Sequence, residues 1–252
     1  MARIVKKSTQ LEDTYQKERT KVIVFGSITA VCFILFTLPV LDDLPLARII
    51  VMLGFAVAGY FLGVVWSNFS AARAGMKGQK AVEDMVRLLP DSYVGYQNLS
   101  ITHNGKTIHP QMVVVGPNGV FVIQSNHRNG RVEGHYNDTK WIQHKTGQKG
   151  GQYEKSFDSP VKRVIHQSDV MKQYLESHGA RIWIERMVWF TYPDVDLKVQ
   201  GQPSPGTLGK VNIYTSLRDG AAESWNYIQN FVSPYPPSSE RVESVKALFD
   251  AL

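Results

Sequence analysis

Two long uncharged apolar runs near the N-terminus restrict the chain more than any other feature of its sequence. Val22–Leu41 contains no charged residue, and Ile49–Ala72 is a second such run. About 20 residues at a rise of roughly 1.5 Å each cross the ~30 Å hydrocarbon core of a bilayer. The acidic break Asp42-Asp43-Leu44-Pro45 separates the runs. We therefore predict a transmembrane helical hairpin with spans at 22–41 and 49–67. The alternatives are a signal peptide, for which the first run is long, and a helical hairpin buried in a soluble core.

Basic residues at the ends of the two runs predict their orientation. Six Lys or Arg residues precede the first run, whereas the connecting segment has only Arg48, beside two aspartates. Arg73, Lys77 and Lys80 follow the second run. Because cytoplasmic flanks carry an excess of Lys and Arg, we expect a two-pass protein of the inner or plasma membrane with both termini cytoplasmic. The expected parts are a cytoplasmic N-terminal segment (1–21), the transmembrane hairpin (22–72) and a cytoplasmic domain (73–252).

Composition adds weaker limits. The formal net charge of +6 permits an anionic partner, such as nucleic acid or a lipid surface, without requiring one. The single cysteine, Cys32, rules out an intrachain disulfide and lies within the first apolar run. The residues that follow the hairpin are enough for one soluble domain.

The segment His109–Gly130 carries the clearest local pattern of that domain. Two apolar, β-branched runs, Met112–Val115 and Val120–Ile123, flank Gly116-Pro117-Asn118-Gly119. Val and Ile suit a buried pleated surface, and Pro, Asn and Gly supply the backbone angles of a tight turn. We predict a β-hairpin with polar residues at its ends. These are Gln111 before the first strand, and Gln124 and Asn126 where the second strand leaves the core.

The rest of the domain alternates helical and strand patterns. Ser159 or Asp158 can cap a helix that has Pro160 in its first turn and that runs to Ser177. The other expected helices cover 68–89, 220–230 and 238–252. The expected strands cover 93–101, 131–134, 140–144, 181–191 and 210–214, with a turn at 102–107 and loops at 146–157 and 193–209. This order predicts an α/β domain with a central mixed sheet flanked by helices.

Three stretches of this domain resemble a known family. They read AGMKGQKAVEDMVRLLPDSYVGYQNL, then VVVGPNGVFVIQSN, then SPVKRVIHQSDVMKQYL. Together they resemble the nuclease-related domain (NERD) over about Ala74–Thr215. The resemblance implies a restriction-endonuclease-like α/β domain of the PD-(D/E)XK superfamily. It also implies Mg²⁺-dependent phosphodiester cleavage, in which carboxylates hold the metal and a lysine helps to place the attacking water.

The groups that this chemistry needs are replaced at every matching position. The first acid of the hairpin falls on Gln111, and the Glu-x-Lys motif falls on Gln124-Ser125-Asn126. The helix glutamate falls on Gln79, and a glutamine common in the later helix falls on Arg163. Carboxamides keep a carbonyl oxygen but lose the charge that captures a divalent cation, and they can bond to one another. We therefore expect no catalytic residues, no metal and no cofactor, with Gln79, Gln111, Gln124 and Asn126 as degenerate positions.

A rebuilt metal site is the alternative. Glu133, Asp138 and Asp158 lie within reach along the sequence, and His109 and His127 lie near the hairpin. Mg²⁺ would then be the cofactor of a divergent nuclease that acts on DNA or RNA. The competing interpretation treats these five as ordinary surface groups.

Basic and aromatic residues after the hairpin suit nucleic-acid binding. Such interleaving favours phosphate contacts combined with base stacking, whereas a solvated loop and helix face is the structural alternative. The expected binding residues are Lys140, Trp141, Lys145, Lys149, Tyr153, Lys155, Lys162 and Arg163.

Our leading hypothesis is thus a membrane-anchored, catalytically inactive NERD-like domain that acts as a scaffold or nucleic-acid-binding subunit of a larger assembly. Its expected partners are the lipid bilayer, DNA or RNA, and other proteins of a membrane-associated complex. The rivals are the divergent Mg²⁺-dependent nuclease and a structural subunit that binds protein only.

Overall fold

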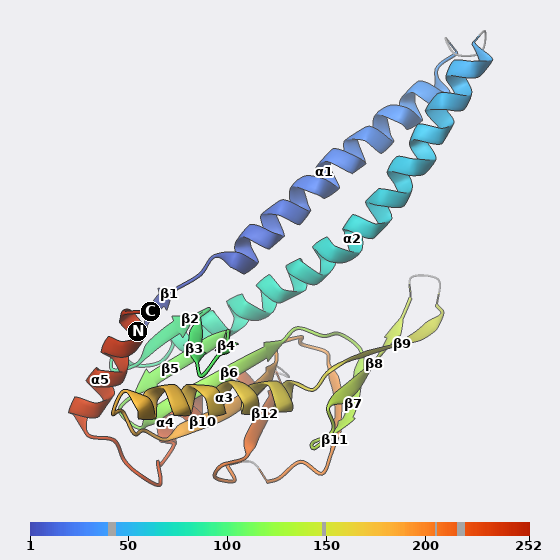
Figure 1. The fold of residues 1–252 in the computed structure, drawn as a ribbon. Helices are drawn as coiled ribbons and strands as arrows, with labels where there is room; N and C mark the ends of the chain where they lie inside the picture. Colours follow the sequence, from blue (N-terminus) through green and yellow to red (C-terminus); the bar gives the residue numbers. More distant parts are fainter. Residues whose placement is uncertain (40–43, 148–149, 205, 216–219) are drawn as a thin grey trace. The chain divides into compact units, whose positions relative to one another are not determined.

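The computed structural model describes residues 1–39, 44–147, 150–204, 206–215 and 220–252 (Figure 1). The chain forms two compact units. One contains Gln10–Met76, and the other combines Met1–Thr9 with Lys77–Leu252. The chain therefore leaves the second unit after nine residues and returns to it at Lys77.

The first unit consists of two long helices. Helix α1 covers Gln10–Thr37, and α2 covers Pro45–Arg87 and continues into the second unit. Ring pairs join the helices, among them Phe25–Phe61 with centroids 5.7 Å apart. Most of their apolar side chains are exposed, and both helices are long and apolar enough to span a membrane. The end of the first predicted span, at 40–41, and the break at Asp42-Asp43 lie outside the described residues.

Helix α2 does not stop where the apolar run ends. We predicted one helix over the second span and another over 68–89, but the structure has a single helix from Pro45 to Arg87. No proline follows Pro45 until Pro90, and most residues of the polar stretch 73–87 are Ala, Met, Lys, Arg, Gln or Glu, which favour helix. The helix therefore continues from an apolar into a polar sequence without a break.

A mixed sheet forms the centre of the second unit, as predicted, but its six strands include Arg3–Lys6 from the N-terminal segment, which was not predicted to belong to it. Its order is β1-β2-β5-β6-β10-β12. The bounds are β1 Arg3–Lys6, β2 Val94–Gln97, β5 Met112–Gly116, β6 Gly119–Asn126, β10 Ile184–Phe190 and β12 Val211–Thr215. Strands β2, β5 and β6 are antiparallel neighbours, whereas the β1–β2, β6–β10 and β10–β12 pairs are parallel. The predicted hairpin is confirmed, because β5 and β6 pair up to Gly116 and Gly119 across the turn.

Helices cover both faces of this sheet. Strand alternation sends Val113 and Val122 into a core shared with α3 (Pro160–Ser177) and α5 (Ser239–Asp250). The neighbouring residues Met112 and Phe121 face the opposite core. That core is shared with the C-terminal turns of α2 and with α4 (Gly220–Asn230). The α/β class with a central sheet between helices is thus confirmed, and α3 begins at the predicted Ser159 cap and Pro160.

A second sheet and a small hairpin flank the central sheet. The second sheet has the order β11-β7-β8-β9, and the hairpin pairs β3 with β4. The bounds are β3 Ile101–His103, β4 Lys106–Ile108, β7 Arg131–His135, β8 Lys140–Thr146, β9 Gln152–Asp158 and β11 Asp196–Gln200. The loops expected at 146–157 and 193–209 are therefore wrong where β9 and β11 lie, and the turn at 102–107 is part of a hairpin. Both missed strands lie at sheet edges and are largely exposed, and the only alternation in β11 is the short pair Leu197 and Val199 within a loop-like sequence.

Candidate functional site

A cluster of amides lies where β5 begins and β6 ends. Gln111 immediately precedes β5, Gln124 and Asn126 close β6, and Gln79 lies on the part of α2 within the same unit. Gln79, Gln111 and Ser125 line one narrow cleft together with Val82, Met112 and Ile123. Gln79 and Gln124 are almost fully buried. Of the four degenerate positions assigned from the family resemblance, the structure brings Gln111 beside both Gln79 and Gln124, whereas Asn126 Nδ2 is buried without a hydrogen-bond partner.

Hydrogen bonds join Gln124 and Ser125 to Gln111 around one oxygen. Gln111 Oε1 accepts from Gln124 Nε2 at 2.9 Å, from Ser125 N at 2.7 Å and from Ser125 Oγ at 3.0 Å. Gln124 Nε2 also donates to the Ser125 carbonyl at 3.1 Å. A carbonyl oxygen has two lone pairs, so three donors occupy its accepting capacity.

Gly78 lets α2 approach the ends of β6 and β10 closely enough to place Gln79. A Cβ atom at Gly78 would lie 3.2 Å from both His127 Cβ and Ser125 Oγ, and 3.3 Å from Thr191 Oγ1. His127 Nδ1 lies 3.1 Å from Thr191 Oγ1. Burial, and then the nearby Lys77 charge, lower the pKa of His127 below its usual range. The imidazole beside the amide cluster is therefore neutral at pH 7.

The donor set of this cleft does not fit a divalent cation. Mg²⁺ sheds its water reluctantly and needs anionic oxygens to compensate. The polar groups here are uncharged, and Gln111 Oε1 is already engaged by three donors. The cleft also has no space for a water-sized sphere. These residues therefore do not support metal-dependent hydrolysis in this cleft.

The acids of the alternative metal site lie apart in separate contacts. Glu133 pairs with Arg131 and lies 3.0 Å from His144 Nε2, Asp138 accepts from the His135 amide, and Asp158 lies 3.9 Å from Arg163. The carbonyl of His109 accepts from Gln167 Nε2 at 3.2 Å, and His127 contacts Thr191. Within the described ranges, no group of three or more His, Cys, Asp or Glu side chains could hold a metal ion.

The structure divides the expected nucleic-acid-binding residues. Lys145, Tyr153 and Lys155 share one face of the second sheet, because Lys145 is directly opposite Tyr153, and Lys155 is opposite Gln143. Strand alternation puts Lys140 on the other face. Lys162 and Arg163 are exposed in the first turn of α3, and Lys149 lies outside the described residues.

Trp141 requires a correction. Its side chain is fully buried, lies parallel to the Phe190 ring at a centroid distance of 6.1 Å, and donates from Nε1 to the His135 carbonyl at 3.0 Å. Gly134 makes room for it, since a Cβ there would come within 2.4 Å of the indole. Trp141 is therefore a core residue that joins the second sheet to the first, and it has no free ring face for a base.

Arg128 is a basic residue that the sequence analysis missed. Its guanidinium carbon lies 3.7 Å from the centre of the Phe157 ring, and Nη1 donates to Gln143 Oε1 at 3.0 Å. Burial lowers the pKa of Arg128, as does the Arg163 charge. Burial, and then the Lys155 and Arg128 charges, also lower the pKa of Lys145. The only sequence signal for Arg128 was its position two residues after Asn126, at the end of the hairpin.

A buried carboxylate was also missed. Glu185 on β10 accepts from Trp183 Nε1 at 2.8 Å, from Asn212 Nδ2 at 2.9 Å and from the Tyr227 hydroxyl at 2.9 Å. These bonds join β10, β12 and α4. Burial raises the pKa of Glu185, and the hydrogen bonds only partly oppose that rise. A single Glu in a strand pattern gives no sign of burial, so nothing in the sequence pointed to this network.

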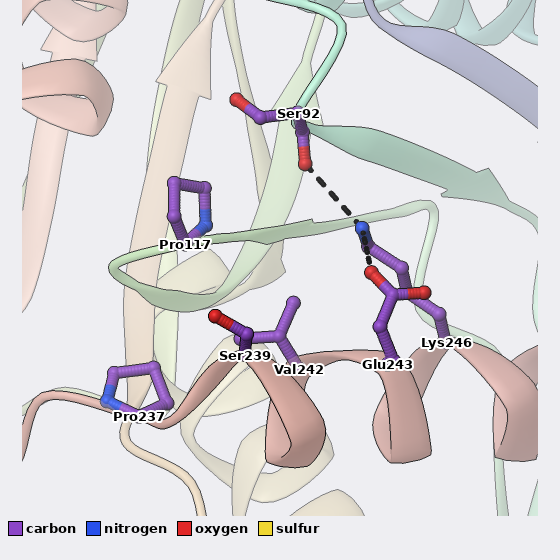
Figure 2. Close-up of a pocket in the computed structure, with 7 residues that line it drawn as sticks. All are labelled: Ser92, Pro117, Pro237, Ser239, Val242, Glu243 and Lys246. Carbon is purple, nitrogen blue, oxygen red and sulfur yellow. Dashed lines mark hydrogen bonds and ion pairs between the residues drawn. The ribbon is translucent and has the colours of Figure 1, made fainter.

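A surface pocket lies beside α5 and the β5–β6 turn (Figure 2). Its volume is about 220 Å³, and its lining comprises Ser92, Pro117, Pro237, Ser239, Val242, Glu243 and Lys246. Lys246 Nζ is 2.7 Å from Glu243 Oε1 and 3.5 Å from the Ser92 carbonyl. Its ammonium is therefore already compensated, and the lining offers no nucleophile with an adjacent base.

Comparison with known proteins finds a family match that covers much of the second unit (Met1–Thr9 with Lys77–Leu252), hereafter the sheet unit. The family model of the nuclease-related domain (NERD) matches residues 74–191. This range begins near the end of α2 and closes just after β10, so it includes the whole amide cluster. Neither a curated protein nor a solved structure matches the chain.

Proposed function

We propose that this protein is a membrane-anchored module that binds nucleic acid without cleaving it. The family model of the nuclease-related domain matches residues 74–191. In this proposal the domain no longer hydrolyses phosphodiesters. It holds nucleic acid, as one subunit of a larger assembly, at the cytoplasmic surface of an inner or plasma membrane.

The hydrogen bond between Gln124 and Gln111 carries the proposal. Two carboxylates at these positions would repel one another unless a cation lay between them. As amides, one donates directly to the other at 2.9 Å. Ser125 adds two more donors to the same oxygen. Gln124 Oε1 and Asn126 Nδ2 stay buried without a hydrogen-bond partner. The bonding therefore supports a pocket in which the Gln111 oxygen is occupied by protein donors rather than by a metal ion.

The path of the chain supports the anchor. Arg3–Lys6 pairs with β2 in the sheet unit, and the chain returns to that unit at Lys77. Both ends of the helical unit (Gln10–Met76) lead into the sheet unit. If the helical unit crosses a membrane, both ends must therefore emerge on the same side, and the chain crosses twice. The Lys and Arg residues outside the apolar runs favour the cytoplasmic side for both ends.

A cleavage assay on the full chain in detergent or nanodiscs tests the proposal. Labelled single- and double-stranded DNA and RNA are incubated with Mg²⁺ or Mn²⁺, with and without a chelator. We expect no chelator-sensitive products and no heat of Mg²⁺ binding by calorimetry. Chelator-sensitive cleavage would contradict the proposal. Its loss in Glu133→Gln or Asp158→Asn would then identify the rebuilt site.

A restored variant serves as the matched control. Gln79→Glu, Gln111→Asp, Gln124→Glu and Asn126→Lys together return the groups that the family resemblance implies. We expect this variant to bind Mg²⁺ in the calorimeter where the natural chain does not. No heat from a folded restored variant would contradict the assignment of these four positions.

A further inference from the structure

The acidic residues of the second sheet are confined to one of its two faces. The cross-strand pairs Trp141–Phe157, Gln143–Lys155 and Lys145–Tyr153 lie on one face. The other face holds all the acids of its four strands, because Glu133, Glu154, Asp158 and Asp196 alternate onto it. There, Glu133 and Glu154 contact His144 on its two ring nitrogens. The first face therefore carries lysines from β8 and β9 without an acid from its own strands.

Arg128 adds a fixed cation to this face. It stacks on Phe157 and donates to Gln143, which in turn donates to the Asn129 carbonyl at 2.6 Å. Both Phe157 and Gln143 belong to the face that bears the lysines. Cation–π stacking and a hydrogen bond together hold the guanidinium in place, so little side-chain freedom remains to be lost on binding.

One exposed aromatic ring lies among these cations. Tyr153 is 51% exposed and is directly opposite Lys145. Aromatic rings on a sheet surface, flanked by basic residues, stack unpaired bases while the cations contact the backbone. In a duplex the bases are paired and stacked on one another, so they are not available to stack on the Tyr153 ring. The combination therefore favours single-stranded over double-stranded nucleic acid.

We propose that Arg128, Lys145, Tyr153 and Lys155, the basic face, form a binding site for single-stranded nucleic acid. Arg128, Lys145 and Lys155 contact phosphates, and Tyr153 stacks on one base. The site rests on the proposed function, since it supplies the place where a non-cleaving domain holds nucleic acid. It is separate from the amide cluster, and the chain links them directly because Arg128 follows Asn126 by two residues.

Fluorescence anisotropy with the full chain in nanodiscs of neutral phosphatidylcholine tests this site. The probes are a labelled oligothymidylate and a duplex of the same length, titrated at several salt concentrations. We expect the single strand to bind more tightly. In the double variant Lys145→Gln and Lys155→Gln, the slope of log affinity against log salt should fall by about 1.4, or about 0.7 for each lost phosphate contact.

Tyr153 variants separate stacking from charge. Tyr153→Ala should weaken single-strand binding by at least about fivefold, which corresponds to one lost stacked base, and should leave the salt slope unchanged. Tyr153→Phe should keep the natural affinity. Arg128→Lys keeps the charge but loses the fixed guanidinium, so it should weaken binding less than Arg128→Gln. An unchanged thermal midpoint in each variant shows that the fold is intact.

Lys140→Gln is the matched control, because Lys140 belongs to β8 but points to the opposite face. It should change neither affinity nor salt slope. If the natural chain binds and the basic-face variants bind equally well, this site is wrong and the proposed function stands. Equal affinity for duplex and single strand would overturn the ligand class. If the natural chain binds neither probe, nucleic-acid binding itself is wrong, and a protein-only scaffold is favoured.

Discussion

Gln111 shows how a change from acid to amide alters the interactions within a pocket. Its carbonyl oxygen accepts three donors, two from Ser125 and one from Gln124. Turning the Gln111 amide around would present an NH₂ group to the Ser125 amide and leave that N–H without an acceptor. The orientation of Gln111 is therefore fixed by the backbone, and the partner at position 124 must be a donor.

A single acid at position 124 should accordingly destabilise the domain. In Gln124→Glu a carboxylate faces the Gln111 oxygen, so two acceptors meet in a buried site, and we expect a loss of about 1–3 kcal/mol at neutral pH. Thermal unfolding followed by tryptophan fluorescence can measure it, since Trp141, Trp183, Trp189 and Trp225 lie in the sheet unit. Gln124→Met, which removes the donor without adding charge, should cost less. Equal losses would show that the facing acceptors are unimportant.

Elements with local signals were predictable, and elements that depend on distant partners were not. The β5–β6 hairpin was predicted from its Pro-Asn-Gly turn, and α3 was predicted from its Ser-Pro cap. Both signals consist of residues adjacent in the sequence. Strands β1, β9 and β11 are short or largely exposed and lie at sheet edges, so the few apolar residues of β1 and β11, Ile4 and Val5 or Leu197 and Val199, give only a weak local signal. The amide cluster was located through the family resemblance. The burial of Trp141 and the stacking of Arg128 depend on tertiary contacts that sequence spacing does not reveal.

The Glu185 network gives the β10–β12–α4 junction a defined pH dependence. Burial raises the pKa of Glu185 above its ordinary value of 4.5. The folded protein therefore binds this proton more tightly than the unfolded chain. The stability that Glu185 contributes is fully present below about pH 4.5 and declines as the pH rises through the raised folded pKa.

Replacing this carboxyl should remove that pH dependence. We expect the difference in unfolding free energy between the natural chain and Glu185→Gln to change with pH in this window. As the pH rises, the unfolding free energy of the natural chain should fall relative to that of the variant. Gln cannot reproduce all three bonds, since its NH₂ group would face the donor Trp183 Nε1. Denaturant unfolding between pH 4 and pH 8 measures both effects. A pH-independent difference would contradict the raised pKa.

At the scale of the whole molecule, the two ends of the helical hairpin lead into one folded unit. Met1–Thr9 and Lys77–Leu252 belong together, whereas Gln10–Met76 is separate. This connectivity, with the basic residues that flank the runs, predicts that Thr9 and Ser239 lie on the cytoplasmic side and Leu44 on the other.

Cysteine labelling in a Cys32→Ser background tests this arrangement. A membrane-impermeant maleimide should react with Leu44→Cys in intact cells, and with Thr9→Cys or Ser239→Cys only after permeabilisation. Opposite accessibility of Thr9→Cys and Ser239→Cys would be incompatible with a two-pass hairpin. Labelling of Ser239→Cys in intact cells would show that the orientation is inverted.

Strand β1 has a consequence for the order in which the protein is made. The ribosome delivers Arg3–Lys6 first, but the pairing partner Val94–Gln97 emerges only after both long helices have been synthesised. Contacts between such distant segments form late, because the intervening loop must first be closed. The edge of β2 therefore stays open to other chains until the segment that carries both long helices has brought Arg3–Lys6 back to Val94–Gln97 and closed that edge.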